Sequence, residues 1–505
     1  MNSPLLLGID LGTSSLKAVL VDRAGRLLSV AQREYPIISR YPGWAEQDPE
    51  LWYQAALETI TQAIRRSGQP AESIAAIGLA GQMHTTVCLG GDGRVLRPAI
   101  LWADQRSSAQ VARVYQELGR DRLAAWTGNP LAAGFMLASW LWLCEHEPEV
   151  RRQTRTLLLP KDYLRYRLTG LLGSEPSDAS STLLFDPARG HWSYPLLDAL
   201  GIDGQLLPPV APSAEVAGGL LPGAAAAAGL KPGTPVVFGG SDQALQALAH
   251  GVIAPGLVSC TIGTGGQLFT PCLSPRPDPG LRLHLFCHVL PGVWHLEAAI
   301  LAAGLSLRWL RDGVFMGMGY SELADLASQA PPGSEGLFFL PYLAGERTPW
   351  MDPQARGAWI GLTVRHDQRH VIRAVMEGVV FALRQGLELM EGLGVPVERV
   401  LASGGATRHP LWLQLQADIF NRPVYPGAVE EATARGAALL AGIGAGFYLD
   451  GADACRQAVH LPDESVRPQA AQVDRYERAF QVYAGLYPAL AGPLAASRED
   501  GGDNR

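Results

Sequence analysis

Two short segments with the same pattern, about half a chain apart, most constrain the fold of this chain. The first reads GIDLGTSSLKAVLVD, residues 8–22, and the second reads VSCTIGTGGQLFTP, residues 258–271. In each, a run of strand-forming residues leads into a Gly-Thr turn and a second apolar run leads away. Each segment predicts a β-hairpin whose turn presents backbone N–H groups and hydroxyls to an anion. Their separation predicts two similar domains that each contribute one hairpin to a shared ligand.

The polar residues of the first hairpin indicate a site for a magnesium–nucleotide complex. Gly12, Thr13 and Ser14 form the predicted turn, and Lys17 follows as a cation. Asp10 precedes the turn, where its carboxylate repels phosphate unless a divalent cation lies between them. Asp and Gly also build ordinary hairpin turns, so a purely structural turn is the alternative for either segment alone. Because the pattern occurs a second time at residues 258–271, we favour the nucleotide site over the purely structural turn.

Length and composition agree with a two-domain globular protein. A chain of 505 residues is too long for one core, and 47% hydrophobic with 18% charged residues argues against bulk disorder. The net charge of −7, without a Lys/Arg-rich run, argues against a nucleic-acid or anionic-membrane surface. Six cysteines without a CxxC pair predict reduced thiols in a cytoplasmic protein. We expect no signal peptide, because Asp10 interrupts the first apolar run, and no membrane span.

Three residues, two of them polar, follow a predicted buried strand at residues 74–79. They are Gln82, Met83 and His84, and open α/β sheets place ligand contacts at this end of a strand. The structural alternative is a satisfied, partly buried histidine at a turn. Trp102, in the next segment, is open to the same two interpretations, as part of a ligand pocket or as part of the core.

Asp242 follows a second predicted strand at residues 236–238 and a Gly-Gly turn. An aspartate before an apolar helix, here expected at residues 244–250, is often only an N-cap. If its side chain faces a cleft, it can instead accept the proton of an alcohol that attacks a phosphate, which requires a carboxylate within hydrogen-bond reach. The local sequence leaves both interpretations open.

The order of these motifs resembles the FGGY family of carbohydrate kinases, in the actin and hexokinase superfamily, over roughly residues 5–490. The resemblance implies an α/β fold of two duplicated ribonuclease H-like domains with a cleft between them. It places a sugar- and phosphate-binding domain at residues 1–250 and a nucleotide-binding domain at 251–495. We expect the polar residues 496–505 to form a disordered tail.

The family pattern implies a role for each matched residue. Asp242 matches the general base and Gln243 the sugar contact beside it. The Gln-Met-His triplet is similar to that of the xylulokinase branch, so Met83, His84 and Trp102 are expected to line the sugar pocket. Asp10 is implied as a catalytic residue that holds Mg²⁺. The residues implied for ATP binding are Gly12, Thr13, Ser14, Lys17, Thr264, Gly304, Arg308, Gly405 and His409.

The resemblance implies ATP- and Mg²⁺-dependent phosphorylation of the terminal hydroxyl of a ketopentose, with D-xylulose favoured. Kinases for ribulose, gluconate or glycerol stay open as alternatives. Glycerol kinases typically carry Arg-Glu where this chain has Met83-His84, but Thr85 stands where many xylulokinases have glycine. A non-catalytic ATP-binding module, as in actin-like filaments or heat-shock chaperones, is the alternative from another class. A homodimer is left open.

Three local expectations concern residues outside these motifs. Asp162 and Asp178 are expected to cap helices, and Asp367 to cap a long amphipathic helix. His284 and His288 lie four residues apart, as metal ligands on a helix do, but their segment is rich in Leu, Phe and Val and predicts a strand.

Overall fold

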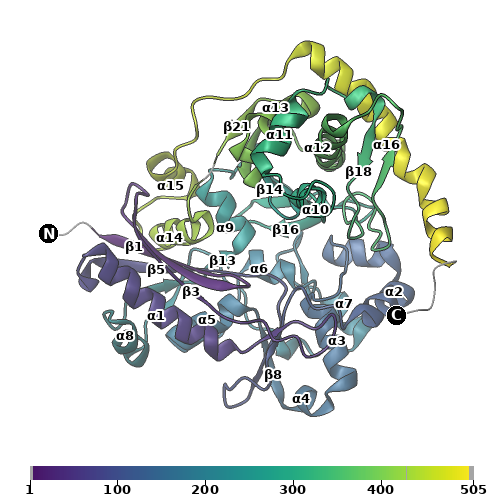
Figure 1. The fold of residues 1–505 in the computed structure, drawn as a ribbon. Helices are drawn as coiled ribbons and strands as arrows, with labels where there is room; N and C mark the ends of the chain where they lie inside the picture. The colour runs from purple at the N-terminus through teal and green to yellow at the C-terminus, as the bar shows by residue number, and fades with distance from the viewer. Residues whose placement is uncertain (1–3, 428, 500–505) are drawn as a thin grey trace.

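The computed structural model describes residues 4–427 and 429–499 and contains two mixed β-sheets in separate halves of the molecule. Figure 1 shows the first sheet, with β1, β3 and β5, below the second sheet, with β14 and β16. The first sheet has the strand order β11-β12-β5-β1-β2-β3, and β13 pairs with β5. Its strands are β1 (Leu5–Leu11), β2 (Ser15–Val21), β3 (Leu27–Glu34), β5 (Ile74–Gly81), β11 (Val216–Gly219), β12 (Pro235–Val237) and β13 (Gly240–Ser241).

The second sheet repeats the topology of the first. Its order is β16-β17-β15-β14-β20-β21. In both sheets three strands joined antiparallel, β3-β2-β1 and β17-β15-β14, continue into two parallel strands, β5-β12 and β20-β21. The strands are β14 (Gly256–Ile262), β15 (Gly266–Cys272), β16 (His284–Cys287), β17 (Trp294–Ile300), β20 (Val397–Gly404) and β21 (Val424–Pro426). This repeat confirms the predicted duplicated α/β fold.

Helices cover both sheets, and capping residues mark the ends of several of them. Helix α1 (Pro49–Ser67) is capped by Asp48 and ends at Gly68, whose φ is 65°. Helix α12 (Gln368–Gly392) is capped by Asp367 and buries its apolar face against the second sheet. The other long helices are α2 (Ser108–Thr127), α3 (Met136–His146), α5 (Pro160–Thr169), α9 (Asp242–Ala249), α10 (Gly304–Gly313), α11 (Tyr320–Ser328), α13 (Pro410–Phe420), α14 (Ala432–Gly444), α15 (Gly451–Ala458) and α16 (Ala470–Glu499).

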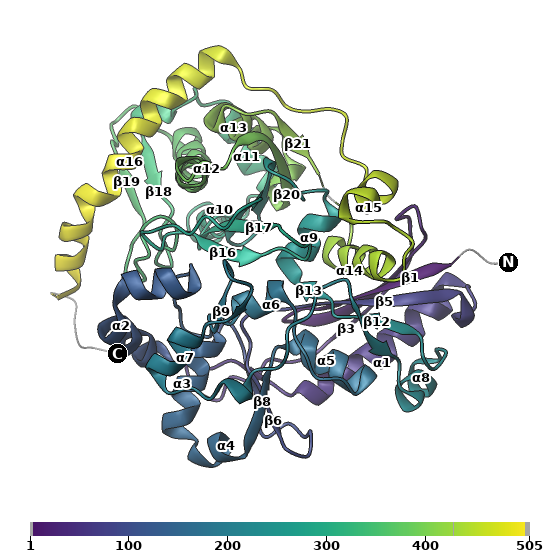
Figure 2. The same cartoon turned by 180° about the vertical axis from the view of Figure 1, so that it is seen from behind.

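Helix α14 follows the second sheet in sequence but packs on the first sheet. It contacts β1, β5 and α9, and both cartoon views place it beside them (Figures 1 and 2). The approach is close because two strand residues are glycines. A Cβ atom at Gly8 would lie 1.8 Å from the Ala434 carbonyl oxygen, and one at Gly78 would lie 1.8 Å from the Ala437 carbonyl oxygen. The two halves of the sequence are therefore interlocked through α14.

Two local expectations differ from the structure. Asp162 and Asp178 do not cap helices: the side chain that accepts N–H groups at the start of α6 (Pro176–Ser181) belongs to Glu175, and Asp162 binds Lys161, Arg165 and Ser174 inside the fold. Residues 496–499, expected in a disordered tail, continue helix α16, and residues 500–505 lie outside the described part of the chain.

The segment that contains His284 forms strand β16, as predicted. Among the helices of the described ranges, none combines the length and the apolar character that a bilayer crossing needs.

Candidate active site

The β1–β2 hairpin turn is bonded to the segments that carry the predicted sugar contacts. Asp10 pairs with Lys17 across the hairpin, and the Gly12 N–H donates to the Ser15 carbonyl at 3.1 Å. The Thr13 hydroxyl donates to Gln82 Oε1 at 3.2 Å and accepts from Trp102 Nε1 at 2.9 Å. The turn, the end of β5 and Trp102 therefore form one hydrogen-bonded unit, in which Trp102 remains 39% exposed.

Lys17 forms an ion pair that the sequence did not indicate. Its Nζ lies 2.7 Å from Oε2 of Glu431, the residue before α14. The pair joins the first hairpin to the segment that returns from the second sheet. A phosphate at this hairpin would share the Lys17 ammonium with Glu431.

The pairing of β5 brings Asp10 and Asp242 to the same end of the first sheet. Ala80 of β5 is paired with Asp10 of β1 on one side and with Gly240 of β13 on the other. Asp242 is the first residue of α9, and Ser241 occupies the N-cap position. The N-cap interpretation of Asp242 is therefore wrong, and one of its carboxylate oxygens is buried without a hydrogen-bond partner among the described residues.

Burial makes both carboxylates weaker acids. Burial, together with the nearby charges of Asp10 and Glu297, raises the pKa of Asp242 to about 8. Burial also raises the pKa of Asp10 to about 6, against the opposing effect of Lys17. Perturbed carboxylates that converge at the end of a central strand are typical of a catalytic site.

Asp10 is suited to hold a divalent cation together with phosphate. A cation beside it would offset the burial that raises its pKa. The described part of the chain has no cluster of three or more acidic, histidine or cysteine side chains that could enclose a metal alone. Magnesium commonly binds through one or two carboxylates, water and substrate phosphates, so a single aspartate fits this ion.

His84 is held in a fixed orientation and in one tautomer. Its Nδ1 lies 2.7 Å from the Ser181 carbonyl, which only accepts hydrogen bonds, so Nδ1 carries the proton. The ring stacks on Phe135 with centroids 3.8 Å apart and planes 5° apart. Burial lowers the pKa of His84 to about 3, so the ring is neutral and Nε2 can accept a hydrogen bond. Met83 packs in the same apolar cluster and is 6% exposed.

Side chains from the second half of the chain complete this region. Gln267 donates a hydrogen bond to Glu297 of β17, and burial raises the pKa of Glu297 to about 7. The charge of half-buried Arg347 lowers the pKa of both His84 and Glu297. Neither Glu297 nor Arg347 was assigned a chemical role from the sequence, because no local pattern indicates one. Their effects on Asp242 and His84 show that the two halves meet at the site.

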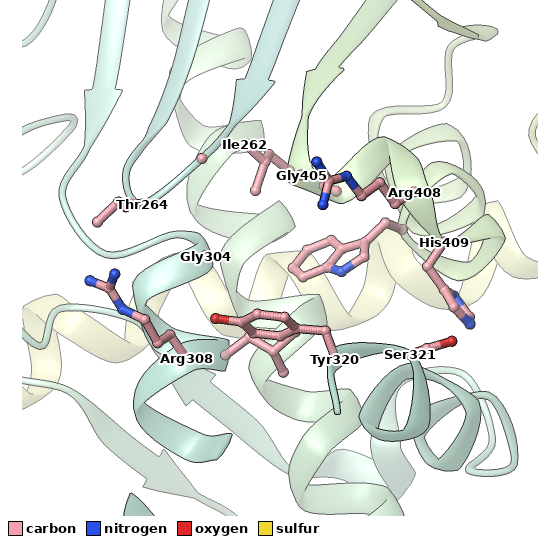
Figure 3. Close-up of a pocket in the computed structure, with 13 residues that line it drawn as sticks. Ile262, Thr264, Gly304, Arg308, Tyr320, Ser321, Gly405, Arg408 and His409 are labelled. Carbon is pink, nitrogen blue, oxygen red and sulfur yellow. The ribbon is translucent and has the colours of Figure 1, made fainter. Parts of the chain in front are cut away.

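A cavity of about 360 Å³ lies in the second half of the molecule, beside the second hairpin (Figure 3). It brings together five of the residues that the family pattern implied for ATP binding, which are Thr264, Gly304, Arg308, Gly405 and His409. The other lining residues are Ile262, Gly263, Leu307, Tyr320, Ser321, Ala406, Arg408 and Trp412. This cavity therefore is the best-formed candidate for the nucleotide pocket.

The second hairpin and helix α10 form one wall of this cavity. The Gly304 N–H donates to the Gly263 carbonyl at 2.9 Å, and the Leu305 N–H donates to the Thr264 carbonyl at 2.9 Å. A Cβ atom at Gly304 would lie 2.3 Å from the Gly263 carbonyl oxygen, so the contact requires glycine.

The aromatic residues of the cavity, and Arg408, were not predicted from the sequence. Figure 3 shows the Tyr320 ring lying across the cavity, with Arg308 and Arg408 extending from different walls. Tyr320 comes from helix α11, and Trp412 comes from helix α13, which follows the turn at Gly405. His409 accepts the Leu411 N–H at 3.2 Å and so caps α13, and its Nε2 lies 3.2 Å from Asp325 Oδ1.

Comparisons with known proteins agree with this geometry. The N-terminal domain of the FGGY family of carbohydrate kinases matches residues 5–249, and the C-terminal domain matches residues 258–445. Xylulose kinase of Bacillus subtilis is 37% identical over 482 residues, covering 95% of this chain and 96% of the relative. Gluconokinase of the same organism is 32% identical over 476 residues, covering 91% and 92%.

A crystal structure of xylulose kinase from Rhodospirillum rubrum superimposes with a TM-score of 0.92 at 31% identity, covering 97% of this chain and 100% of that one. These matches confirm the resemblance that the hairpins, the Gln-Met-His triplet and the Gly-Gly-x-Asp turn indicated. The chain belongs to the FGGY family of carbohydrate kinases.

Proposed function

We propose that this protein transfers the γ-phosphoryl group of ATP to the terminal hydroxyl of D-xylulose and forms D-xylulose 5-phosphate. One observation carries the proposal: Asp10, Asp242 and the Gln82–His84 segment all adjoin the same end of β5. The similarity to xylulose kinases over 95% of the chain supports the choice of sugar.

In the proposed mechanism, Asp242 accepts the proton of the sugar hydroxyl as its oxygen attacks the γ-phosphorus. Its raised pKa, about 8, makes it a stronger base than an ordinary aspartate once ionised. A positioned base of this kind contributes about 10²–10⁴-fold in rate. The neutral His84 offers Nε2 as an acceptor for a sugar hydroxyl, and Gln243 and Trp102 complete the proposed sugar contacts.

The two hairpins are proposed to bind the phosphates. N–H groups of their turns, with the hydroxyls of Thr13, Ser14 and Thr264, stabilise charge on the phosphoryl oxygens. Asp10 would hold Mg²⁺, which when bound neutralises part of the phosphate charge. The Lys17 ammonium group also stabilises phosphate charge, to the extent that phosphate competes with the Glu431 carboxylate for it. Closure of the two halves over the sugar would keep water from accepting the phosphoryl group.

The experiment that tests the substrate is ADP release measured with a panel of D-xylulose, D-ribulose, D-gluconate and glycerol. We expect the highest kcat/KM with D-xylulose. Gluconate is the second candidate, because Bacillus subtilis gluconokinase is 32% identical over most of the chain. A higher kcat/KM with gluconate would replace xylulose as the substrate, and ADP release unaffected by every sugar would contradict a sugar kinase.

A further inference from the structure

The turn that carries Asp242 is held on both sides by serines of other segments. Gly239, which has a φ of 90°, donates its N–H to the Ser213 carbonyl at 3.0 Å. The Ser241 N–H, directly before Asp242, donates to Ser177 Oγ at 2.9 Å. These two bonds fix the 238–239 and 240–241 peptide groups of the turn.

Both serines are bonded to one buried carboxylate, that of Glu175. It accepts the Ser213 hydroxyl at 2.6 Å and the Ser177 hydroxyl at 2.8 Å. It also accepts the N–H groups of Ser177 and Asp178, at 2.9 and 2.8 Å. Glu175, Ser177 and Ser213, here called the Glu175 network, are all buried.

The charge of Glu175 determines which way the Ser177 hydroxyl points. An ionised carboxylate only accepts hydrogen bonds, so the Ser177 hydroxyl donates to Glu175. Its lone pairs are then free to accept the Ser241 N–H. Lys161 Nζ, 3.5 Å from Glu175 Oε1, supplies the opposite charge that a buried carboxylate needs.

Lys161 and its neighbour Arg165 also contact the beginning of the turn. The Phe238 carbonyl accepts from Arg165 at 3.2 Å and from Lys161 at 3.5 Å. A Cβ atom at Gly239 would lie 2.9 Å from Lys161 Cδ, so the turn lies directly against this side chain. Polar contacts therefore hold the turn from Phe238 to Ser241, while Asp242 Oδ1 has no partner among the described residues.

We infer that the Glu175 network positions the Asp242 carboxylate for proton transfer. A base displaced by about 1 Å can lose about 10²-fold in rate, so rigid support of its turn has a direct kinetic value. The inference rests on the proposed function, in which Asp242 is the base. Glu175, Ser177 and Ser213 are positioning residues, since they act on the reaction through the turn.

Ser177→Ala tests the inference by removing the acceptor of the Ser241 N–H. Its matched control is Ser180→Ala in the same short helix. Ser180 is equally buried, and its Oγ accepts the Cys287 N–H at 3.1 Å, so the control loses the same kind of bond elsewhere. We expect kcat to fall about 10-fold or more in Ser177→Ala, with KM for ATP within about twofold of the parent. Ser180→Ala should keep kcat within about threefold at a similar loss of Tm.

Ser213→Ala tests the other arm of the network and serves if Ser177→Ala does not fold. It keeps the backbone bond to Gly239 but removes the hydroxyl bonded to Glu175. We expect a smaller fall in kcat, about threefold or more, again with KM for ATP unchanged.

Asp242→Asn, measured in parallel, separates failure of this inference from failure of the proposed mechanism. If Asp242→Asn is inactive but Ser177→Ala and Ser213→Ala keep the parent kcat, the positioning role is wrong and the proposed base stands. If the serine variants and Ser180→Ala lose kcat equally, the effect is general destabilisation and the inference is also overturned. If Asp242→Asn turns over at the parent rate, both the base and its positioning are wrong.

Discussion

At the scale of single residues, the site depends on carboxyl groups whose ionised forms are disfavoured by burial. Burial, together with the charges of Asp10 and Glu297, raises the pKa of Asp242 to about 8. In the proposed mechanism Asp242 must be ionised to accept a proton, so we expect its protonation below this pKa to remove activity. We predict that kcat/KM for the sugar rises about tenfold per pH unit below pH 8 and levels off above it. A profile that is flat from pH 6 to 9 would contradict this role; the measurement is the initial rate at subsaturating sugar.

The same pKa shift predicts an effect on stability. The pKa of Asp242 is higher in the folded state than in the unfolded state, so the contribution of this group is most favourable below the unfolded value and is lost as pH rises toward about 8. The Asp242→Asn variant has no carboxyl group to ionise at this position, so its Tm at pH 8 should exceed that of the parent. At pH 3, below the pKa of Asp242 in both states, the group is largely protonated whether folded or unfolded, so the two Tm values should converge. Thermal unfolding at both pH values tests this, and a lower Tm for the variant at pH 8 would contradict it.

At the scale of helices, strands and turns, the sequence was sufficient to predict the features that depend on residues close together in the chain. Both hairpins, the capped helix α12 and the Gly-Gly turn before Asp242 were predicted, because glycine and capping residues act locally. The sequence could not place α14 on the first sheet, nor pair Lys17 with Glu431, because these contacts join residues far apart in the chain, 414 positions in the case of Lys17 and Glu431. It also missed Tyr320 and Trp412, which reach the cavity only through tertiary packing.

The packing of α14 on the first sheet leads to a prediction at this scale. Gly78→Ala would place a Cβ atom 1.8 Å from the Ala437 carbonyl oxygen, so strand and helix must separate. We expect a loss of about 1–3 kcal/mol in the free energy of unfolding, or more. The control is Gly485→Ala in α16, where an added Cβ atom would meet no neighbouring segment within 4 Å in the described part of the chain, and it should stabilise the protein by about 1 kcal/mol. Denaturant unfolding measures both, and equal stability of the two variants would contradict the close packing.

At the scale of the whole molecule, two copies of one topology both contribute residues to the candidate site. The first copy supplies Asp10, Asp242 and the His84 segment, and the second supplies Glu297 and the cavity beside Thr264. Helix α14, which the second half of the sequence contributes, packs on the first sheet and carries the Lys17–Glu431 contact at its beginning. Residues from both halves therefore have to be in place before a phosphoryl group can pass from nucleotide to sugar.

The role of Asp242 as the base can be tested by single-turnover phosphorylation of D-xylulose. The parent and Asp242→Asn are compared at saturating ATP and Mg²⁺. We predict that the variant binds ATP with nearly the parent affinity, because the proposed nucleotide pocket beside Thr264 lies in the other half of the molecule. Its rate of phosphoryl transfer should fall by about 10²–10⁴-fold. A transfer rate within a few-fold of the parent would show that Asp242 is not the base.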